Sequence, residues 1–149
     1  MTNTQNTATP VEFVQAVEKY FNIHFIYDMA ADATNNKAEI WCDEDTNALN
    51  IDWPRNDWCF LNPPFKTVGK WCQKCDIESK QGSKIITIWP LSSDINMVRA
   101  YKNANVYIIQ GRIWGCVRGT MLCVWGEGFK EPVKGLHWDK KEKTLTRAW

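Results

Sequence analysis

Short apolar segments alternate along this chain with segments whose apolar residues recur at three- and four-residue steps. The first pattern is typical of buried β-strands and the second of amphipathic helices. Their alternation predicts a layered α/β fold with a mainly parallel sheet. Strands are predicted at residues 24–28, 39–42, 57–61, 84–89, 106–110 and 119–125, and helices at residues 11–22, 68–80 and 95–101.

The ends of the chain differ from this pattern. Residues 1–8 are polar and expected to be disordered. Thr9 is predicted to cap the first helix, with Pro10 at its first position. The glycine-punctuated connection 111–119 predicts an antiparallel hairpin that closes the C-terminal end of the sheet. We therefore expect one domain over residues 9–128, followed by a mixed-charge tail, 129–149, with no predicted element.

Composition narrows the class of protein. A chain of 149 residues has room for one core, and a formal charge of +1 excludes a broadly basic nucleic-acid binder, so any DNA contact must be local. The N-terminus lacks the features of a signal peptide, which favours reduced thiols for the six cysteines and a cytoplasmic location. The apolar runs are far too short to span a membrane.

The most informative motif is Asn62-Pro63-Pro64-Phe65, which follows the predicted strand 57–61. Two prolines cannot continue a strand inside a sheet, so a loop must begin there. Ligands of open α/β sheets bind at the carboxyl ends of the strands, where this loop would lie. Because proline fixes its own φ and restricts the residue before it, the loop is stiff and Asn62 has a defined orientation.

This group of residues suits a flat heterocycle that carries an amine. The Asn62 side-chain oxygen and the Pro63 carbonyl can each accept one amine proton, while Phe65 stacks on the ring. Such acceptors localise the lone pair of a weakly nucleophilic amine and favour its attack on an electrophilic methyl group.

With this motif the chain resembles the DNA N6-adenine and N4-cytosine methyltransferases, and over residues 9–126 it is similar to the small phage-type N6-adenine enzymes of the Dam family. The supporting features are Thr9-Pro10, Asp28, Asn47-Ala48-Leu49, Trp53, Trp71 and Gly111-Arg112-Ile113. The resemblance implies a Rossmann-like class I methyltransferase sheet. It also implies transfer of a methyl group from S-adenosylmethionine to the N6 amine of adenine in DNA, catalysed at Asn62-Pro63-Pro64-Phe65.

The resemblance also implies a cofactor site. In place of the usual glycine-rich loop, Ala30 and Ala31 are expected to allow close backbone approach, and the acidic run 43–45 offers a carboxylate to the ribose. The residues expected to contact S-adenosylmethionine are Thr9, Pro10, Asp28, Ala30, Ala31, Asp45 and Asn47.

The target adenine must leave the DNA stack to reach Asn62. Lys66, Arg112 and Arg118 are the expected DNA contacts, and a second subunit would extend this small surface. The resemblance places such an enzyme in a bacterial cell that carries the phage or prophage. No metal site is expected, because the cysteines do not form a second Cys-x-x-Cys pair. His24 and His137 are expected to be structural.

Two alternatives remain open at this point. One is a methyltransferase fold that binds nucleic acid or cofactor without turnover, which the nine tryptophans and scattered basic residues would also suit. The other is a thioredoxin-like redox protein, because Trp71-Cys72-Gln73-Lys74-Cys75 matches the Trp-Cys-x-x-Cys motif. That motif normally opens a helix after a strand, whereas here it falls inside a helical pattern.

Overall fold

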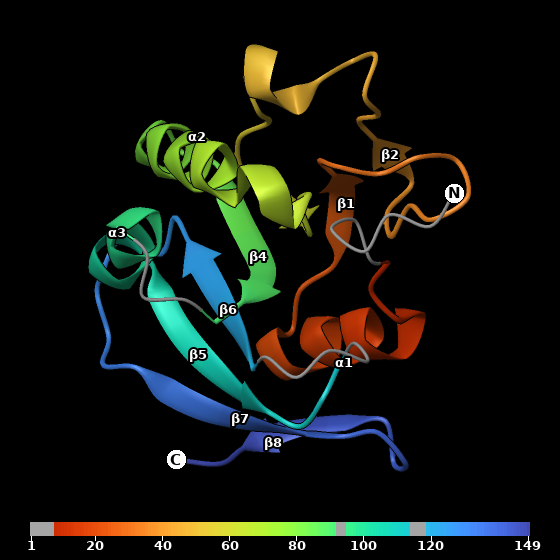
Figure 1. Cartoon of the computed structure of the whole chain (residues 1–149), viewed down its shortest axis with the longest axis vertical. Helices are drawn as coiled ribbons and strands as arrows, with labels where there is room; N and C mark the ends of the chain where they lie inside the picture. The colour runs from red at the N-terminus through yellow and green to blue at the C-terminus, as the bar shows by residue number, and fades with distance from the viewer. Residues whose placement is uncertain (1–7, 92–94, 114–118) are drawn as a thin grey trace.

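The computed structural model describes residues 8–91, 95–113 and 119–149 (Figure 1). Except for residue 8, the segment 1–8 predicted to be disordered lies outside the described residues. Three α-helices are present in the described part: α1 (Val11–Phe21), α2 (Val68–Lys80) and α3 (Ile95–Asn103). The strands are β1 (Phe25–Asp28), β2 (Ile40–Trp41), β3 (Trp58–Leu61), β4 (Lys84–Pro90), β5 (Asn105–Gln110), β6 (Thr120–Trp125), β7 (Lys134–Asp139) and β8 (Thr144–Arg147).

All the described strands belong to one eight-stranded sheet with the order β2-β1-β3-β4-β6-β5-β7-β8. The pairs β1–β2, β1–β3, β3–β4 and β5–β7 are parallel, whereas β6 runs antiparallel to both neighbours and β8 antiparallel to β7. A mixed α/β fold with a mainly parallel sheet is confirmed. The predicted antiparallel pairing of β5 with β6 is confirmed. This pair does not close the sheet as predicted, because β7 and β8 extend the sheet beyond β5.

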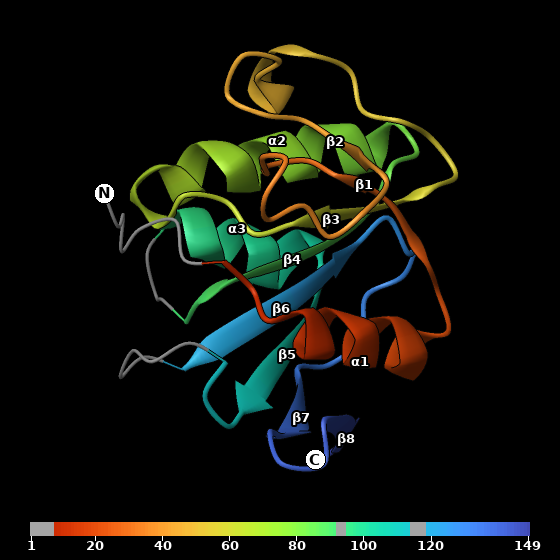
Figure 2. The same cartoon turned by 90° about the vertical axis from the view of Figure 1, so that its right-hand side faces the viewer.

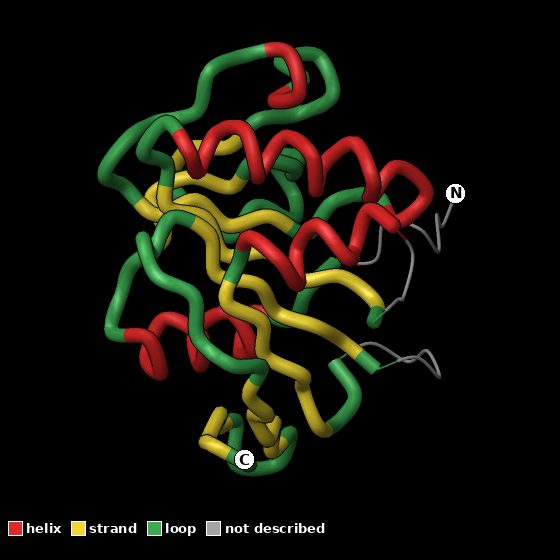
Figure 3. Tube along the Cα trace, turned by 90° about the vertical axis from the view of Figure 1, so that its left-hand side faces the viewer, coloured by secondary structure: helices red, strands yellow, loops and turns green. Residues whose placement is uncertain are grey.

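The helices cover both faces of the sheet, giving three layers (Figures 2 and 3). Helices α2 and α3 pack on one face and α1 on the other. Side chains of a strand alternate between faces, so Ile85 and Trp89 of β4 pack with the α2–α3 layer, whereas Ile86 and Ile88 pack with α1. This two-sided burial explains why the sequence of β4 is apolar on both faces and does not alternate between apolar and polar residues.

The start of α1 differs from its prediction. Pro10 occupies the N-cap position, and its carbonyl accepts the N–H groups of Phe13 and Val14. Thr9 does not cap the helix: its hydroxyl bonds the side chain of Asn62 instead. The helix ends as expected near Asn22, which has the left-handed φ of 54°.

Residues 134–147 contain β7 and β8, two strands in the segment that was expected to be a tail with no element. Leu136, Trp138 and Leu145 are buried beneath α1, but the polar and charged residues between them obscure the pattern of alternation. The segment is thus part of the sheet.

Candidate active site at the carboxyl ends of the strands

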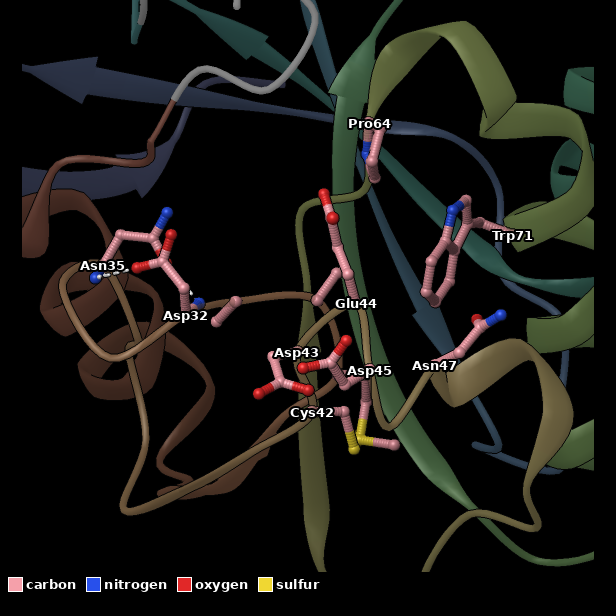
Figure 4. Close-up of a pocket in the computed structure, with 12 residues that line it drawn as sticks. Asp32, Asn35, Cys42, Asp43, Glu44, Asp45, Asn47, Pro64 and Trp71 are labelled. Carbon is pink, nitrogen blue, oxygen red and sulfur yellow. Dashed lines mark hydrogen bonds between the residues drawn. The ribbon is translucent and has the colours of Figure 1, made fainter. Parts of the chain in front are cut away.

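Strands β1, β2 and β3 are parallel, so the loops that follow them meet at one edge of the sheet. These loops enclose a cleft of about 540 Å³, within the roughly 300 to 1,000 Å³ typical of small-molecule sites. The residues that line it are Met29, Ala30, Ala31, Asp32, Asn35, Cys42, Asp43, Glu44, Asp45, Asn47, Pro64 and Trp71 (Figure 4). The structure thereby brings together Ala30, Ala31, Asp45, Asn47 and Pro64, all named in the sequence analysis.

The loop after β1 is held by the side chain of Asp28. One carboxylate oxygen of Asp28 accepts the backbone N–H of Ala30 at 3.3 Å, and the other accepts that of Lys37 at 2.9 Å. Asp28 is 2% exposed and lies beside the cleft rather than in its lining. Its carboxylate therefore holds both ends of the loop that forms one wall of the cleft.

A second pair of residues braces the same loop from within. Asn35 accepts the backbone N–H of Asp32 at 2.8 Å, while Asp32 accepts the backbone N–H groups of Thr34 and Asn35. The hydrogen bond from the Thr34 hydroxyl, followed by those from these N–H groups, holds the pKa of Asp32 below its ordinary value. These carboxylate bonds give the loop a fixed shape without any glycine.

Burial dominates the electrostatics of Asp28. It raises the pKa of this carboxyl from 3.8 to about 6, although the two N–H groups and the charge of Lys37 act in the opposite direction. Desolvation likewise lowers the pKa of Lys37, against the raising effect of the nearby carboxylates. The base of the loop thus holds a buried carboxyl group whose hydrogen bond to Lys37 is made by the backbone N–H of that residue.

The loop after β2 forms the acidic wall of the cleft. Asp43 accepts the backbone N–H of Thr46 at 2.9 Å, a bond that helps to lower its pKa, and so holds the turn together. Asn47 has a φ of 50°, and its side chain accepts the N–H of Leu49 at the start of a short 3-10 turn. Glu44 and Asp45 also line the cleft, so this wall carries several carboxylates.

The Asn-Pro-Pro-Phe segment lies at the end of β3, as the sequence predicts, but only part of it opens on the cleft. Pro64 lines the cleft, whereas Asn62 is 9% exposed, and its side-chain Nδ2 donates to the Thr9 hydroxyl at 2.8 Å. Phe65 begins a 3-10 turn that leads into α2 and is half-buried against the apolar core. Asn62, Thr9 and Asp28 share a separate small hollow next to the cleft.

Some lining residues were not among the expected cofactor contacts. Trp71 is on the first turns of α2, which follows the 3-10 turn after the motif, and its indole faces the Asn47 side of the cleft (Figure 4). Its position is set by the short connection between β3 and α2, a signal present in the sequence. Met29, Asn35 and Cys42 also line the cleft. The conformation of the loops places them there, and the periodicity of apolar residues does not predict it.

Of the expected DNA contacts, two are in described segments. Lys66 follows the motif directly, and Arg112 follows β5; both are exposed. Arg118 lies outside the described residues. Within the described part of the chain, no cluster of His, Cys, Asp and Glu is arranged to hold a metal ion.

The Cys72–Cys75 pair lacks the features of a redox site. Both residues are buried in the body of α2, and burial raises the pKa of Cys75 well above that of an ordinary thiol. A reactive thiol needs exposure and a lowered pKa, so the structure argues against the thioredoxin-like interpretation.

None of the helices in the described part of the chain has the length and apolar character needed to cross a membrane.

Comparison with known proteins supports the methyltransferase resemblance. No curated protein matches the chain in sequence. A family model described as DNA N-6-adenine-methyltransferase (Dam) matches residues 2–132, which is most of the sequence. The chain therefore belongs to the Dam family of DNA N-6-adenine-methyltransferases.

Proposed function

We propose that this protein transfers a methyl group from S-adenosylmethionine to the exocyclic N6 amine of adenine in DNA. One observation carries the proposal: an acidic cleft of about 540 Å³ adjoins the Asn-Pro-Pro-Phe segment at the carboxyl ends of parallel strands. The strand order, with parallel strands β2-β1-β3-β4 and an inserted antiparallel β6, supports the Rossmann-like class I methyltransferase fold that such chemistry uses.

The cleft suits the cofactor in size and chemistry. S-adenosylmethionine supplies an electrophilic methyl group on a positively charged sulfur, and it carries an ammonium group and a ribose. Glu44 and Asp45 offer carboxylates that attract positive charge and accept hydroxyl protons. Trp71, Met29 and Pro64 provide apolar surface for an adenine ring. The residues present therefore fit this group.

Asn62 and Pro63 would act on the target amine. Their side-chain and backbone oxygens would each accept one proton of the amine, which keeps the lone pair on nitrogen and directed at the methyl group. The nitrogen–carbon bond forms as the sulfur–carbon bond breaks, and the amine then loses a proton to water. Most of the rate enhancement would come from positioning, so a general base is not required.

The DNA would approach from the same edge of the sheet. Lys66 and Arg112 are exposed there and suit phosphate contacts, and Arg118 is proposed with them. The target base must flip out of the stack to meet Asn62. A net charge of +1 predicts weak non-specific affinity, which a homodimer would increase. We place this activity in the cytoplasm of a bacterium that carries the phage or prophage.

The proposal is tested by methyl transfer from isotopically labelled S-adenosylmethionine to duplex DNA. Adenine-containing duplexes are compared with duplexes made only of G·C pairs, and the product nucleosides are separated. We expect label in N6-methyladenine alone. Asn62→Ala should abolish transfer, and Asp45→Asn should raise KM for the cofactor.

The matched control is Glu142→Gln, which removes one negative charge in the turn between β7 and β8, away from the cleft. It should leave transfer unchanged. Label in cytosine, or full transfer by Asn62→Ala, would contradict the proposal.

The burial of Asn62 favours one second candidate, a protein that binds cofactor or DNA without turnover. Calorimetric binding of S-adenosylmethionine together with no transfer to any adenine-containing duplex would favour this candidate.

A further inference from the structure

The side chains of Thr9 and Asn62 form a buried hydrogen bond across 53 residues of sequence. The Asn62 Nδ2 donates to the Thr9 Oγ1 at 2.8 Å, and the two residues are only 4% and 9% exposed. Water therefore does not compete effectively for this bond, and Thr9 lies outside the lining of the large cleft. A threonine that binds the cofactor would be expected in that lining.

Thr9 is a rigid anchor because of where α1 begins. The next residue, Pro10, has a fixed φ of −58°, and its carbonyl accepts the N–H groups of Phe13 and Val14. Phe13 and Val17 are fully buried in the core under the sheet, so α1 cannot shift without disrupting that core. The hydroxyl of Thr9 is thereby fixed relative to β3.

An asparagine in a methyl-transfer site has a problem that an aspartate does not have. Its amide presents an acceptor on one side and a donor on the other, so rotation by half a turn would point an NH2 group at the target amine. A donor facing a donor repels the substrate and cannot localise its lone pair. The side chain must therefore be held in one orientation for catalysis.

We propose that Thr9 is a positioning residue that holds the Asn62 amide with its Nδ2 toward α1, so that the Oδ1 is presented to the target amine. This inference rests on the proposed function and assigns Thr9 a role on Asn62 rather than on the cofactor. It predicts that Thr9 affects the rate of the chemical step and leaves cofactor affinity unchanged.

The test compares Thr9→Val, which keeps the side-chain shape and removes the hydroxyl, with Thr9→Ser, which keeps the hydroxyl. We expect Thr9→Val to lower kcat by roughly tenfold to a hundredfold, the loss typical of misplaced catalytic groups, with KM for S-adenosylmethionine changed less than about twofold. Thr9→Ser should retain kcat. Thr9→Ala, which adds no buried methyl group, provides a second variant without the hydroxyl.

The control is Thr87→Val in β4, which also removes a buried hydroxyl from a side-chain N–H donor, here the Trp125 Nε1 at 3.2 Å. It should lower stability without lowering kcat. An unchanged kcat in Thr9→Val overturns the inference. An increased kcat also overturns it, because it would show that the segment around Thr9 obstructs access to Asn62. A raised cofactor KM with normal kcat also overturns it.

Asn62→Asp gives a sharper comparison, because a carboxylate presents an acceptor in either orientation. In this background Thr9→Val should cost less than about threefold; an undiminished loss contradicts the proposal. A nitrogen-15 NMR spectrum separates this inference from the activity itself. The side-chain NH2 signal that disappears in Asn62→Asp should shift and exchange faster with water in Thr9→Val than in Thr9→Ser, even if no methyl transfer is found. Identical NH2 signals in the two variants would overturn the inference.

Discussion

The Asp28 carboxylate accepts the backbone N–H of Lys37 at 2.9 Å, nine residues further along the chain. The same carboxylate accepts the N–H of Ala30, so a single buried side chain closes the loop between them. In many nucleotide-binding folds, glycines allow the backbone to turn tightly at this position. Here an acidic side chain stabilises the turn by satisfying two N–H groups that the loop conformation leaves without backbone partners.

The first prediction concerns the pH dependence of stability. Burial raises the pKa of Asp28 to about 6 from 3.8, so the folded state holds this proton more tightly than the unfolded state does. Stability from this group is therefore present below pH 4 and is lost as the pH rises through about 6, by up to about 3 kcal/mol. Asp28→Asn does not titrate, so wild type should lose stability relative to the variant between pH 4 and pH 7. Urea unfolding at several pH values measures this, and a constant difference would refute it.

The second prediction concerns Glu78, a buried carboxylate in α2. It accepts the backbone N–H of Trp53 at 2.7 Å and pairs with Lys74 at 3.2 Å and Arg55 at 3.3 Å. Burial raises its pKa, but these hydrogen bonds and the Lys74 charge outweigh that effect and lower it. Glu78→Gln should reduce the free energy of unfolding at pH 7 by about 2 to 3 kcal/mol.

A carboxylate with a lowered pKa stabilises the folded state only at a pH above the ordinary pKa of the group, which is 4.5 for Glu78. The loss of unfolding free energy caused by Glu78→Gln should therefore shrink as the pH falls below about 4.5. Glu127→Gln, an exposed change in the loop after β6, serves as the control and should be nearly neutral. A penalty that is independent of pH would show that the charge is not the source of the stability.

Two glycines in the loop between β6 and β7 provide a third prediction. Both have left-handed backbones, with φ of 92° at Gly126 and 79° at Gly128. A Cβ at Gly126 would collide with the carbonyl oxygen of Ser83, whereas a Cβ at Gly128 would meet nothing within 4 Å. Gly128→Ala should therefore cost about 1 kcal/mol of backbone strain, and Gly126→Ala about 2 to 5 kcal/mol. Equal losses in thermal unfolding would refute the steric argument.

The main elements of the fold were predictable because their patterns are local. Helix α2 has its predicted bounds, and β4 extends one residue beyond its prediction. Apolar runs and helical periodicity report burial directly. By contrast, β7 and β8 bury only one face, and charged residues in their turn and on their exposed face hide the alternation. The insertion of β6 between β4 and β5 is a choice of pairing partner, which no local pattern encodes.

The candidate site was predictable where single residue types restrict the backbone. Pro63 and Pro64 ended β3 as expected, and Ala30 and Asp45 line the cleft that follows β1 and β2. The hydrogen bond between Thr9 and Asn62 was not predictable, because a threonine before a proline at the start of a helix is typical of an N-cap. Long-range side-chain bonds depend on how layers pack, and the sequence carries no periodic signal for them.

The last prediction concerns the proposed DNA contact of Lys66. An exposed lysine one residue after Phe65 would neutralise a phosphate close to the flipped base. Replacing it removes one ionic contact, so Lys66→Gln should weaken binding to every duplex sequence alike. The slope of log affinity against log salt should also become shallower by about 1.

Lys140→Gln, in the turn between β7 and β8, removes the same charge far from the motif and should change neither the affinity nor the salt slope. Fluorescence anisotropy titrations at several salt concentrations measure both. A weakening by Lys66→Gln that is confined to one DNA sequence would show that Lys66 contacts a base rather than the backbone.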